Sequence, residues 1–374
     1  MKVKAKLSFA LSKALNMLCC LSKIEKKVVF DSFKGKQYSD NPRAISEKMH
    51  ELYPDYKIVW VLPKGYDRSK IPEYVEAHDA FSLQYRRERA SAIAYVRNEA
   101  MTEDMHKRKG QLYIQTWHGD RGIKEILYDS WKDGKRPMKV MDAELTDFFV
   151  VGSDYAERRI KTAFRYHGKT IKSGCPRNDC LLNPKDVAGI KQSIHVGQDK
   201  KILLYAPTLR IGVDVFKGTL DIRETMEHLN GTGDKWVCLV RAHPKSLGLD
   251  LQGGVDVVDV SKYPDMSDLL MIADMLITDY SSSAGDFILR RKPVILAQYD
   301  REEYKRGFHV NMESTGYLVA KTQEELNAYI DNLSAEDFAE NCEKVMDFFG
   351  TCETGHASED VCRLIDEHYR AANR

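Results

Sequence analysis

The sequence lacks several features that would assign it to a specialised class of protein. No apolar run reaches the roughly 18 residues that a helix needs to span a bilayer, and there is no internal repeat or low-complexity segment. Neither charge dominates, because Lys+Arg 57 against Asp+Glu 56 leave a net charge of +1, which gives no general case for nucleic-acid binding. The 374 residues, 43% of them hydrophobic, instead indicate about two globular domains with ample cores.

The cysteines lack the spacing of a metal site. The chain has eight cysteines, but none forms a Cys-x-x-Cys pair and no Cys/His cluster has zinc-finger spacing. This usage is typical of reduced thiols in a cytoplasmic protein, so we expect no structural metal.

The N-terminus imitates a signal peptide but lacks its defining features. Lys13 interrupts the apolar stretch 7–21, and no small-x-small cleavage site follows it. At helical spacing the leucines share one face and the lysines fall on the other. This pattern fits a helix that lies in the membrane interface and is attracted by anionic lipid, and it fits equally a helix packed on its own domain.

Short apolar runs alternate with helical stretches along the rest of the chain. A polar stretch, 176–201, separates two sets of runs and indicates an interdomain linker, and the tail 324–369 has a helical pattern. The alternation predicts open parallel α/β sheets. The expected strands are 27–30, 56–62, 112–117, 147–151 and 170–174 in the first set, and 201–208, 236–240, 255–258, 275–277, 294–296 and 317–319 in the second.

Three serines lie between a buried strand and a helix in the stretch 275–287. Asp279 and Tyr280 follow the strand, and Ser281, Ser282 and Ser283 open the helical pattern. Unpaired backbone N–H groups and the positive end of the helix dipole suit a phosphate at such a turn, and serine hydroxyls add donors. Taken alone, the serines favour the simpler interpretation of an ordinary capped helix.

Polar side chains of a similar kind follow three other predicted strands. His118 follows one strand, Thr208 and Arg210 follow a second, and Arg241 and His243 follow a third. The carboxyl ends of parallel strands meet at one edge of a sheet, and two α/β domains bind ligands in the cleft between them. The convergence of these groups with the serines predicts a site for an anionic phosphate ligand.

Read in order, these motifs resemble those of the CDP-glycerol glycerophosphotransferases, which build the polyol-phosphate chains of teichoic acids and some capsules. The resemblance covers residues 27–350 and includes motifs around 31–42, 173–178 and 286–307. Its most specific parts are Gln-Thr-Trp-His-Gly at 115–119, Leu-Tyr-Ala-Pro-Thr-Leu-Arg at 204–210, Arg-Ala-His-Pro at 241–244 and Thr-Asp-Tyr-Ser-Ser at 278–282.

The resemblance implies a GT-B architecture, with two Rossmann-like domains that face a central cleft and a helical C-terminal tail. We expect an amphipathic membrane-associating segment at 1–25, an acceptor-binding domain at 26–190, a CDP-alcohol-binding domain at 191–345 and the tail at 346–374. A polyprenyl-linked acceptor, also implied by the resemblance, would place the enzyme on the cytoplasmic face of the cell membrane as a peripheral protein.

The implied reaction moves glycerol phosphate from CDP-glycerol to a hydroxyl of a glycan or polyol-phosphate acceptor and releases CMP. The attacking alcohol must lose a proton, and a histidine can take it, so His118 is the candidate base. His243 is the second candidate catalytic residue, as an acid toward the leaving phosphate. Without the resemblance, His118 could equally cap a turn and His243 could belong to a His-Pro turn hydrogen-bonded to backbone.

Positioned donors stabilise charge in phosphoryl transfer, so the other strand-end residues receive binding roles. The cytidine ring is expected near 263–270, Asp279 could instead cap its helix, and Thr208 and Arg210 could form a surface turn. The expected donor-phosphate ligands are Arg241, Ser281, Ser282, Ser283, Thr208 and Arg210; the ribose or glycerol contacts are Asp279, Pro244 and Met266; and the acceptor side holds Asp120, Lys124, Asn98 and Ser39.

The loop after His118 departs from the family pattern. Many members have Thr-Pro-Leu-Lys after Trp-His-Gly, whereas this chain has Asp120-Arg-Gly-Ile-Lys124. Asp120 could orient the imidazole, hold an acceptor hydroxyl or be a solvated loop acid. The departure therefore concerns the identity of the acceptor more than the chemistry.

No cofactor is implied with certainty. Mg²⁺ often accompanies diphosphates, but arginine and histidine could supply the positive charge, and no paired carboxylates form an evident metal site. Three alternatives stay open: the same chemistry with CDP-ribitol or another CDP-alcohol, a nucleotide-sugar glycosyltransferase of the same fold, and a non-catalytic nucleotide-binding scaffold. The presence of both His118 and His243 argues against the scaffold.

Overall fold

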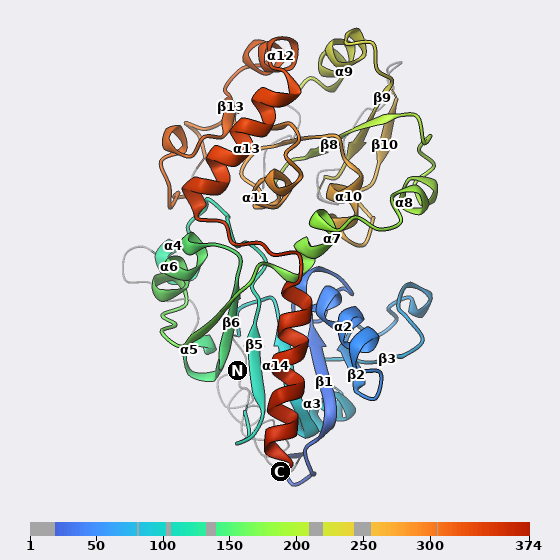
Figure 1. Cartoon of the computed structure of the whole chain (residues 1–374), viewed down its shortest axis with the longest axis vertical. Coiled ribbons are helices and arrows are strands. Elements are labelled where there is room, and N and C mark those ends of the chain that lie inside the picture. The colour runs from blue at the N-terminus through green and yellow to red at the C-terminus, as the bar shows by residue number, and fades with distance from the viewer. Residues whose placement is uncertain are drawn as a thin grey trace, which may run out of the picture.

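Two parallel β-sheets form the two halves of the molecule and lie one above the other along its long axis (Figure 1). This computed structural model describes residues 19–80, 82–101, 106–131, 140–208, 220–242, 256–304 and 306–374. The predicted α/β class with two sheets is confirmed. Most of the segment 1–25, together with Arg210, His243 and Pro244, lies outside the described residues.

The N-terminal half contains a seven-stranded sheet in the order β3-β2-β1-β4-β5-β6-β7, in which every pair of neighbours is parallel. Every residue of the central strand β4 is buried, as expected for a sheet covered on both faces. The strands are β1 (Glu25–Asp31), β2 (Lys57–Val61), β3 (Val75–His78), β4 (Ala92–Arg97), β5 (Leu112–Gln115), β6 (Phe148–Val151) and β7 (Lys169–Lys172), and the helices are α2 (Asp40–Leu52), η1 (Arg68–Lys70), α3 (Leu83–Ser91), α4 (Leu127–Ser130), α5 (Asp142–Leu145) and α6 (Asp154–Ala163).

The C-terminal half contains a six-stranded parallel sheet in the order β10-β9-β8-β11-β12-β13. The strands are β8 (Lys201–Ala206), β9 (Trp236–Val240), β10 (Val257–Asp259), β11 (Met275–Thr278), β12 (Val294–Ala297) and β13 (Leu318–Ala320). The helices are α9 (Ile222–Gly231), α10 (Met266–Ile272), α11 (Ser283–Phe287), η3 (Ile288–Arg290), η4 (Met312–Ser314), α12 (Gln323–Asn332) and α13 (Ala335–Phe349).

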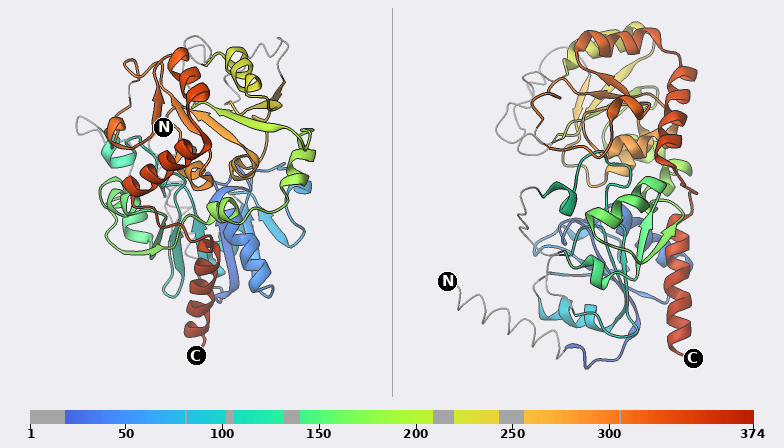
Figure 2. Two further views of the ribbon diagram at one scale, coloured as in Figure 1. Left: turned by 45° about the horizontal axis from the view of Figure 1, so that its top comes forward. Right: turned by 90° about the vertical axis from the view of Figure 1, so that its left-hand side faces the viewer.

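Two stretches of chain connect the halves. The predicted linker contains η2 (Pro176–Asn178), α7 (Asp179–Leu182) and α8 (Val187–Ser193), and η2 is buried although the sequence there is polar. The second connection follows α13, where the chain returns to the N-terminal half and forms α14 (Ala357–Ala372) against α2. Figure 2 shows α13 and α14 one after the other along the same side of the molecule. The domain boundaries proposed from sequence stay a prediction.

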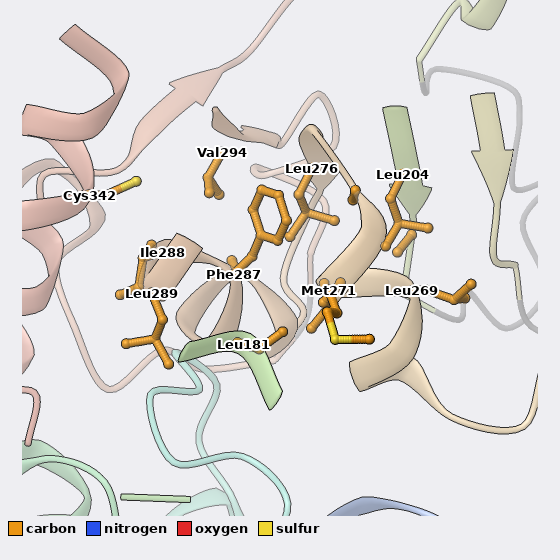
Figure 3. Close-up of a cluster of buried hydrophobic side chains, with 14 of the residues drawn as sticks. Leu181, Leu204, Leu269, Met271, Leu276, Phe287, Ile288, Leu289, Val294 and Cys342 are labelled. Carbon is orange, nitrogen blue, oxygen red and sulfur yellow. The ribbon is translucent and has the colours of Figure 1, made fainter. Parts of the chain in front are cut away.

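The core of the C-terminal half anchors the helix that follows the three serines. Phe287 of α11 is fully buried among side chains from α10, β11 and β12, and Leu181 of the linker helix α7 joins the same cluster (Figure 3). Ile123 and Tyr155 of the N-terminal half also belong to this cluster. The core therefore continues across the contact between the halves, and α11 is held directly at that contact.

The strands expected from the sequence omit two strands of the N-terminal sheet, the central strand β4 and the edge strand β3. Strand β3 was missed because its sequence, Val-Glu-Ala-His, is short and carries only two apolar side chains on its buried face. Among the described helices, none is long and apolar enough to cross a bilayer. Leu21, near the start of the described residues, leaves 84% of its surface exposed.

A methyl group at Gly285 should destabilise the protein. A Cβ there would lie 2.6 Å from Cβ of Arg121 on the other half, which is closer than two carbons approach without a backbone shift. Overpacking of this kind lowers the free energy of unfolding by about 1–3 kcal/mol. Thermal and denaturant unfolding of Gly285→Ala should show that loss, whereas Gly231→Ala, where a Cβ meets open space, serves as the matched control and should be neutral or slightly stabilising. Equal stability of Gly285→Ala and the unaltered chain would contradict the close packing.

Candidate active site

A cavity of about 790 Å³ opens between the two halves at the carboxyl ends of their strands. It brings together residues that follow β5, β8, β9 and β11, as the sequence predicted. The N-terminal half contributes Phe33, Lys36, Gln37, Asp40, Tyr66, Asp67, Lys70 and His118 to its wall; Arg177 comes from the linker; and the C-terminal half contributes Ala206, Pro207, Thr208, Arg241, Ala242, Ser261, Lys262, Tyr263, Pro264, Met266, Ser267, Leu270, Ser281, Ser282, Ser283 and Asp286.

His118 is held in one tautomer by a backbone carbonyl. Its Nδ1 lies 2.7 Å from the carbonyl oxygen of Asn98, which can only accept a hydrogen bond. Nδ1 therefore carries the proton, and Nε2 keeps a lone pair on a side chain that lines the cavity. A carboxylate oxygen of Glu99 lies 3.6 Å from Nδ1, where it would stabilise the ring once Nε2 takes a proton. His118 thus has the arrangement of a general base.

The backbone before His118 is bent into a conformation that tryptophan rarely adopts. Trp117 has a φ of 50°, in the left-handed region. Its N–H donates to the side chain of Gln115 at 2.8 Å, and its carbonyl accepts from Asn41 at 2.8 Å. The rings of Trp117 and Phe33 pack against the imidazole, with centroids 4.1 and 5.2 Å away. These contacts fix the direction in which His118 points.

Arg241 brings an incompletely paired positive charge to the opposite side of the cavity. Its backbone N–H donates to the carbonyl of Tyr205, which fixes the start of the loop after β9. Among the described residues its buried Nη1 has no hydrogen-bond partner. Burial lowers the pKa of Arg241, although Asp265 and Asp268 oppose this effect. A buried guanidinium nitrogen without a partner is costly, and an anionic ligand in the cavity would remove that cost.

The three serines form a small network at the start of α11. Ser282 occupies the N-cap position without making a side-chain cap, whereas Ser281 Oγ accepts from both the N–H and the hydroxyl of Ser283, at 3.3 and 2.9 Å. Ser282 Oγ donates to the carbonyl of His118 at 3.5 Å, across the contact between the halves. The serine turn is therefore partly capped by Ser281, and all three serines also line the cavity.

Asp279 ties two strands together and does not line the cavity, and its expected contact with ribose or glycerol stays a prediction. Its carboxylate accepts from the N–H of Thr208, 3.0 Å from each oxygen, and from the Thr208 hydroxyl at 3.1 Å. The side chain of Gln298 donates to the Asp279 carbonyl. Asp279 thereby fixes the end of β8 against the end of β11 and places Thr208, which does line the cavity.

The four residues expected on the acceptor side, Asp120, Asn98, Ser39 and Lys124, make contacts with other parts of the protein. Both oxygens of Asp120 accept hydrogen bonds at 2.6 Å, from the N–H of Gly152 and the hydroxyl of Ser153. Asn98 bonds the N–H of Phe33 and the hydroxyl of Ser32, and Ser39 is buried at the N-cap of α2. Lys124 forms an isolated bridge with Phe308. None of these four lines the cavity, and their contact with an acceptor stays a prediction.

Two kinds of lining residue were missed by sequence reasoning. Arg177 and Asp40 form an ion pair at 3.1 Å in the cavity wall, and both belong to motifs noted in the sequence without a role. Lys36 and Lys70 lie on the rim of the N-terminal half, where only the spacing after β1 and β2 could have indicated them. Met266 lines the cavity as expected.

No cluster of metal ligands faces the cavity among the described residues. Glu76, His78 and Glu88 lie close enough together to hold an ion, but they belong to β3 and α3 at the outer edge of the sheet. Lys27 and Lys57 already pair with these carboxylates. Positive charge in the cavity comes instead from side chains such as Arg241 and Lys262.

Comparisons with known proteins identify related sequences. The teichoic acid poly(glycerol phosphate) polymerase of Bacillus subtilis (strain 168) is 31% identical over 393 residues, which cover 97% of this chain and 52% of the polymerase. The teichoic acid glycerol-phosphate transferase of Staphylococcus aureus (strain NCTC 8325 / PS 47) is 31% identical, with 92% of this chain and 94% of the transferase covered. The chain thus spans about half the length of the polymerases of B. subtilis and Staphylococcus epidermidis that it matches.

Solved structures give the same relationship. The wall teichoic acid polymerase TagF superposes with a TM-score of 0.84 at 28% sequence identity, covering 100% of this chain and 98% of that one. A UDP-GlcNAc 2-epimerase of Methanocaldococcus jannaschii matches with a TM-score of 0.52 at 11% identity, covering 91% and 99%, which shows a shared fold alone. The GT-B type architecture expected from the sequence is confirmed.

The family itself is shown by a match along almost the whole chain. The model of the family described as CDP-Glycerol:Poly(glycerophosphate) glycerophosphotransferase matches residues 14–367. That range contains both sheets, the linker and most of α14. This protein therefore belongs to the CDP-glycerol:poly(glycerophosphate) glycerophosphotransferase family.

Proposed function

We propose that the protein transfers glycerol phosphate from CDP-glycerol to an acceptor hydroxyl in teichoic acid synthesis and releases CMP. The observation that carries the proposal is the fixed tautomer of His118, whose Nε2 is a free base on the wall of a cavity that also contains Arg241. Family membership and the relatives named as glycerol-phosphate polymerases and transferases support it. A TagF structure soaked with CDPG, in a variant with a substituted histidine, also supports a CDP-glycerol donor.

In the proposed reaction, His118 activates the acceptor. Nε2 takes the proton of the acceptor hydroxyl as its oxygen attacks the phosphorus that carries glycerol. The bond from that phosphorus to the oxygen shared with CMP breaks, and CMP leaves with the electron pair. The new imidazolium is stabilised by the Asn98 carbonyl and the nearby Glu99 carboxylate. His118 receives the proton of the acceptor hydroxyl, the acceptor oxygen receives glycerol phosphate, and CMP is released. The step therefore needs no further reactant.

The C-terminal half binds the donor in this proposal. Arg241 offers its incompletely paired guanidinium to the diphosphate, and the hydroxyls of Ser281, Ser282 and Ser283 add donors at the start of α11. Met266 and the neighbouring part of the wall, 261–267, would contact the nucleoside. The roles expected for Arg210, His243 and Pro244 stay predictions from the sequence, because these residues lie outside the described part of the chain.

We also propose that the acceptor is lipid-linked and that the protein works as a peripheral protein on the cytoplasmic face of the membrane. At helical spacing the leucines and lysines before residue 21 fall on opposite faces. This pattern, with the exposed side chain of Leu21, supports an interfacial segment there. Lys36 and Lys70 on the cavity rim would suit a polyol-phosphate acceptor, because each repeat of such a chain carries a negative charge.

Replacing His118 should abolish transfer without weakening donor binding. In His118→Ala the acceptor hydroxyl loses its base, and we expect CMP release to fall by about a hundredfold or more. Calorimetric binding of CMP should stay within about threefold, because the donor groups lie on the other half. His228→Ala is the control. His228 pairs with Asp331 on the surface, so this variant should keep full activity. Undiminished release by His118→Ala would refute the assigned role.

Replacing Arg241 should weaken the binding of the donor without lowering the stability of the protein. Arg241→Met removes a buried, incompletely paired charge, so the melting temperature should stay equal or rise. The affinity for CDP-glycerol should fall about tenfold to a hundredfold, since a charged hydrogen bond is lost. Arg291→Met removes an exposed arginine on the same half and should change neither.

Calorimetry with CDP-glycerol, CDP-ribitol and UDP-glucose on the unaltered protein identifies the donor. Selective binding of CDP-ribitol would replace glycerol by ribitol in the proposal, which the related ribitol-phosphate polymerases of S. aureus make a definite second candidate. Binding of UDP-glucose alone, or of none of the three, would overturn the proposal.

A further inference from the structure

The departing loop after His118 places a fully buried arginine at the contact between the halves. Arg121 donates from Nε to the carbonyl of Gly285 at 2.5 Å and from Nη1 to the carbonyl of Gly152 at 3.1 Å. Its Nη2 pairs with Glu353 at 2.7 Å and with Asp286 at 3.4 Å. Each guanidinium nitrogen is therefore paired, and the partners come from both halves of the molecule.

The guanidinium stays charged in spite of its burial. Desolvation lowers the pKa of Arg121, but the neighbouring carboxylates, Glu353 first and Asp120 next, more than offset that effect and raise it. A permanently charged group of this kind keeps its fork geometry at any pH at which the protein is folded.

Both connections between the halves meet at Arg121. Glu353 lies in the return segment between α13 and α14, and its second oxygen accepts from the N–H of Cys175 at the start of the linker. Asn178 of the linker donates to both Glu353 and Asp286, at 2.8 and 3.0 Å. Arg177 adds a second buried pair to Asp286 at 2.8 Å. The loop, the linker, the return segment and α11 thus share one ionic network.

Close backbone packing accompanies the network. A Cβ on Gly285 would lie 2.6 Å from Cβ of Arg121, and one on Gly122 would lie 3.4 Å from Cβ of Ser282. The hydroxyl of Ser282 also reaches the carbonyl of His118. The six residues 117–122 therefore carry the catalytic base and press directly on the first turn of α11, whose serines line the donor side of the cavity.

We propose that Arg121, held by Glu353 and Asp286, is a positioning residue that fixes the spacing between the base and the donor phosphate. The inference rests on the proposed function of the cavity. His118 belongs to one half and Arg241 with the serines to the other, so their separation depends on how the halves meet. A base must lie within hydrogen-bond reach of the attacking hydroxyl, and a shift of about 1 Å costs roughly a hundredfold in rate.

This role explains the departure of the loop without a change of chemistry. Asp120 holds the base of the loop to Gly152 and Ser153, while Arg121 extends across to α11. Both residues therefore act on the packing of the loop and of the two halves, and neither lines the cavity.

The test compares Arg121→Met, Arg121→Lys and Glu353→Gln with the unaltered full-length chain. The contacts of Arg121 with Glu353 and Asp286 are called the clamp below. Loss of the clamp should lower kcat for CMP release by about tenfold or more, while the calorimetric Kd for CDP-glycerol stays within about threefold. Arg121→Lys keeps the positive charge but loses the forked guanidinium, so its kcat should lie between those of Arg121→Met and the unaltered chain. If Arg121→Met does not fold, Arg121→Lys and Glu353→Gln still decide the question.

Lys27→Met is the matched control, because it also breaks a buried ion pair, to Glu88, but near the amino end of β1, whereas the cavity lies at the carboxyl ends of the strands. It should lower the melting temperature and leave kcat within about twofold. A purely structural role of Arg121 would give the same pattern as this control, and that result would overturn the proposal. A parallel fall of kcat and donor affinity would overturn it as well.

Hydrogen exchange separates failure of this inference from failure of the proposed function. Amides of 283–290 and 117–123 should exchange faster in Arg121→Met than in Lys27→Met, whatever the donor is. If the unaltered protein transfers no glycerol phosphate but the exchange pattern is seen, the clamp stands and the proposed function fails. Equal exchange in the two variants would overturn the clamp even if the enzyme is active.

Discussion

The structure depends on a group of buried charges where two α/β halves touch. Arg121 and Arg177 form ion pairs with the carboxylates of Glu353 and Asp286. The charges are paired with one another inside the protein and are shielded from solvent. Buried ion pairs add little net stability, because desolvation cancels much of the attraction, but breaking one of them is costly. Their value here is geometric: each charge can be satisfied in only one arrangement of loop, linker, return segment and α11.

Much of the fold can be predicted from the sequence, because the strands of parallel α/β units are short apolar runs between helical stretches. Trp236–Val240 was predicted to the residue, and the ends of β5, β8, β9 and β11 were located well enough to collect the cavity wall. Strand β3 was missed because it is short and lies at the sheet edge, where a strand needs few apolar side chains. The helical content of the linker was missed because its buried groups are polar and find their partners elsewhere in the chain.

The site residues divide along the same line. His118, Arg241, Thr208, Met266 and the serines line the cavity because a strand end fixes where the next residues lie. The hydrogen bonds of Asp120 and Asp279 could not be predicted, because their partners, Ser153 and Thr208, are 33 and 71 positions away in the chain. Charge at a strand end looks the same in sequence whether it faces a ligand or a neighbouring backbone. The tautomer of His118 was equally out of reach, since it is set by a carbonyl twenty residues earlier.

The return of the chain to the N-terminal half has a consequence for the order in which the protein can form during synthesis. Val361, Cys362 and Ile365 of α14 are fully buried in a core with Ile45 and Val28, which leave the ribosome hundreds of residues before them. Domains generally fold as units as they are made, but this sheet cannot cover its apolar face until the C-terminal half has already emerged. During that interval the apolar side chains that α14 covers stay exposed, so the time needed to translate 201–356 sets how long the nascent chain is prone to aggregation.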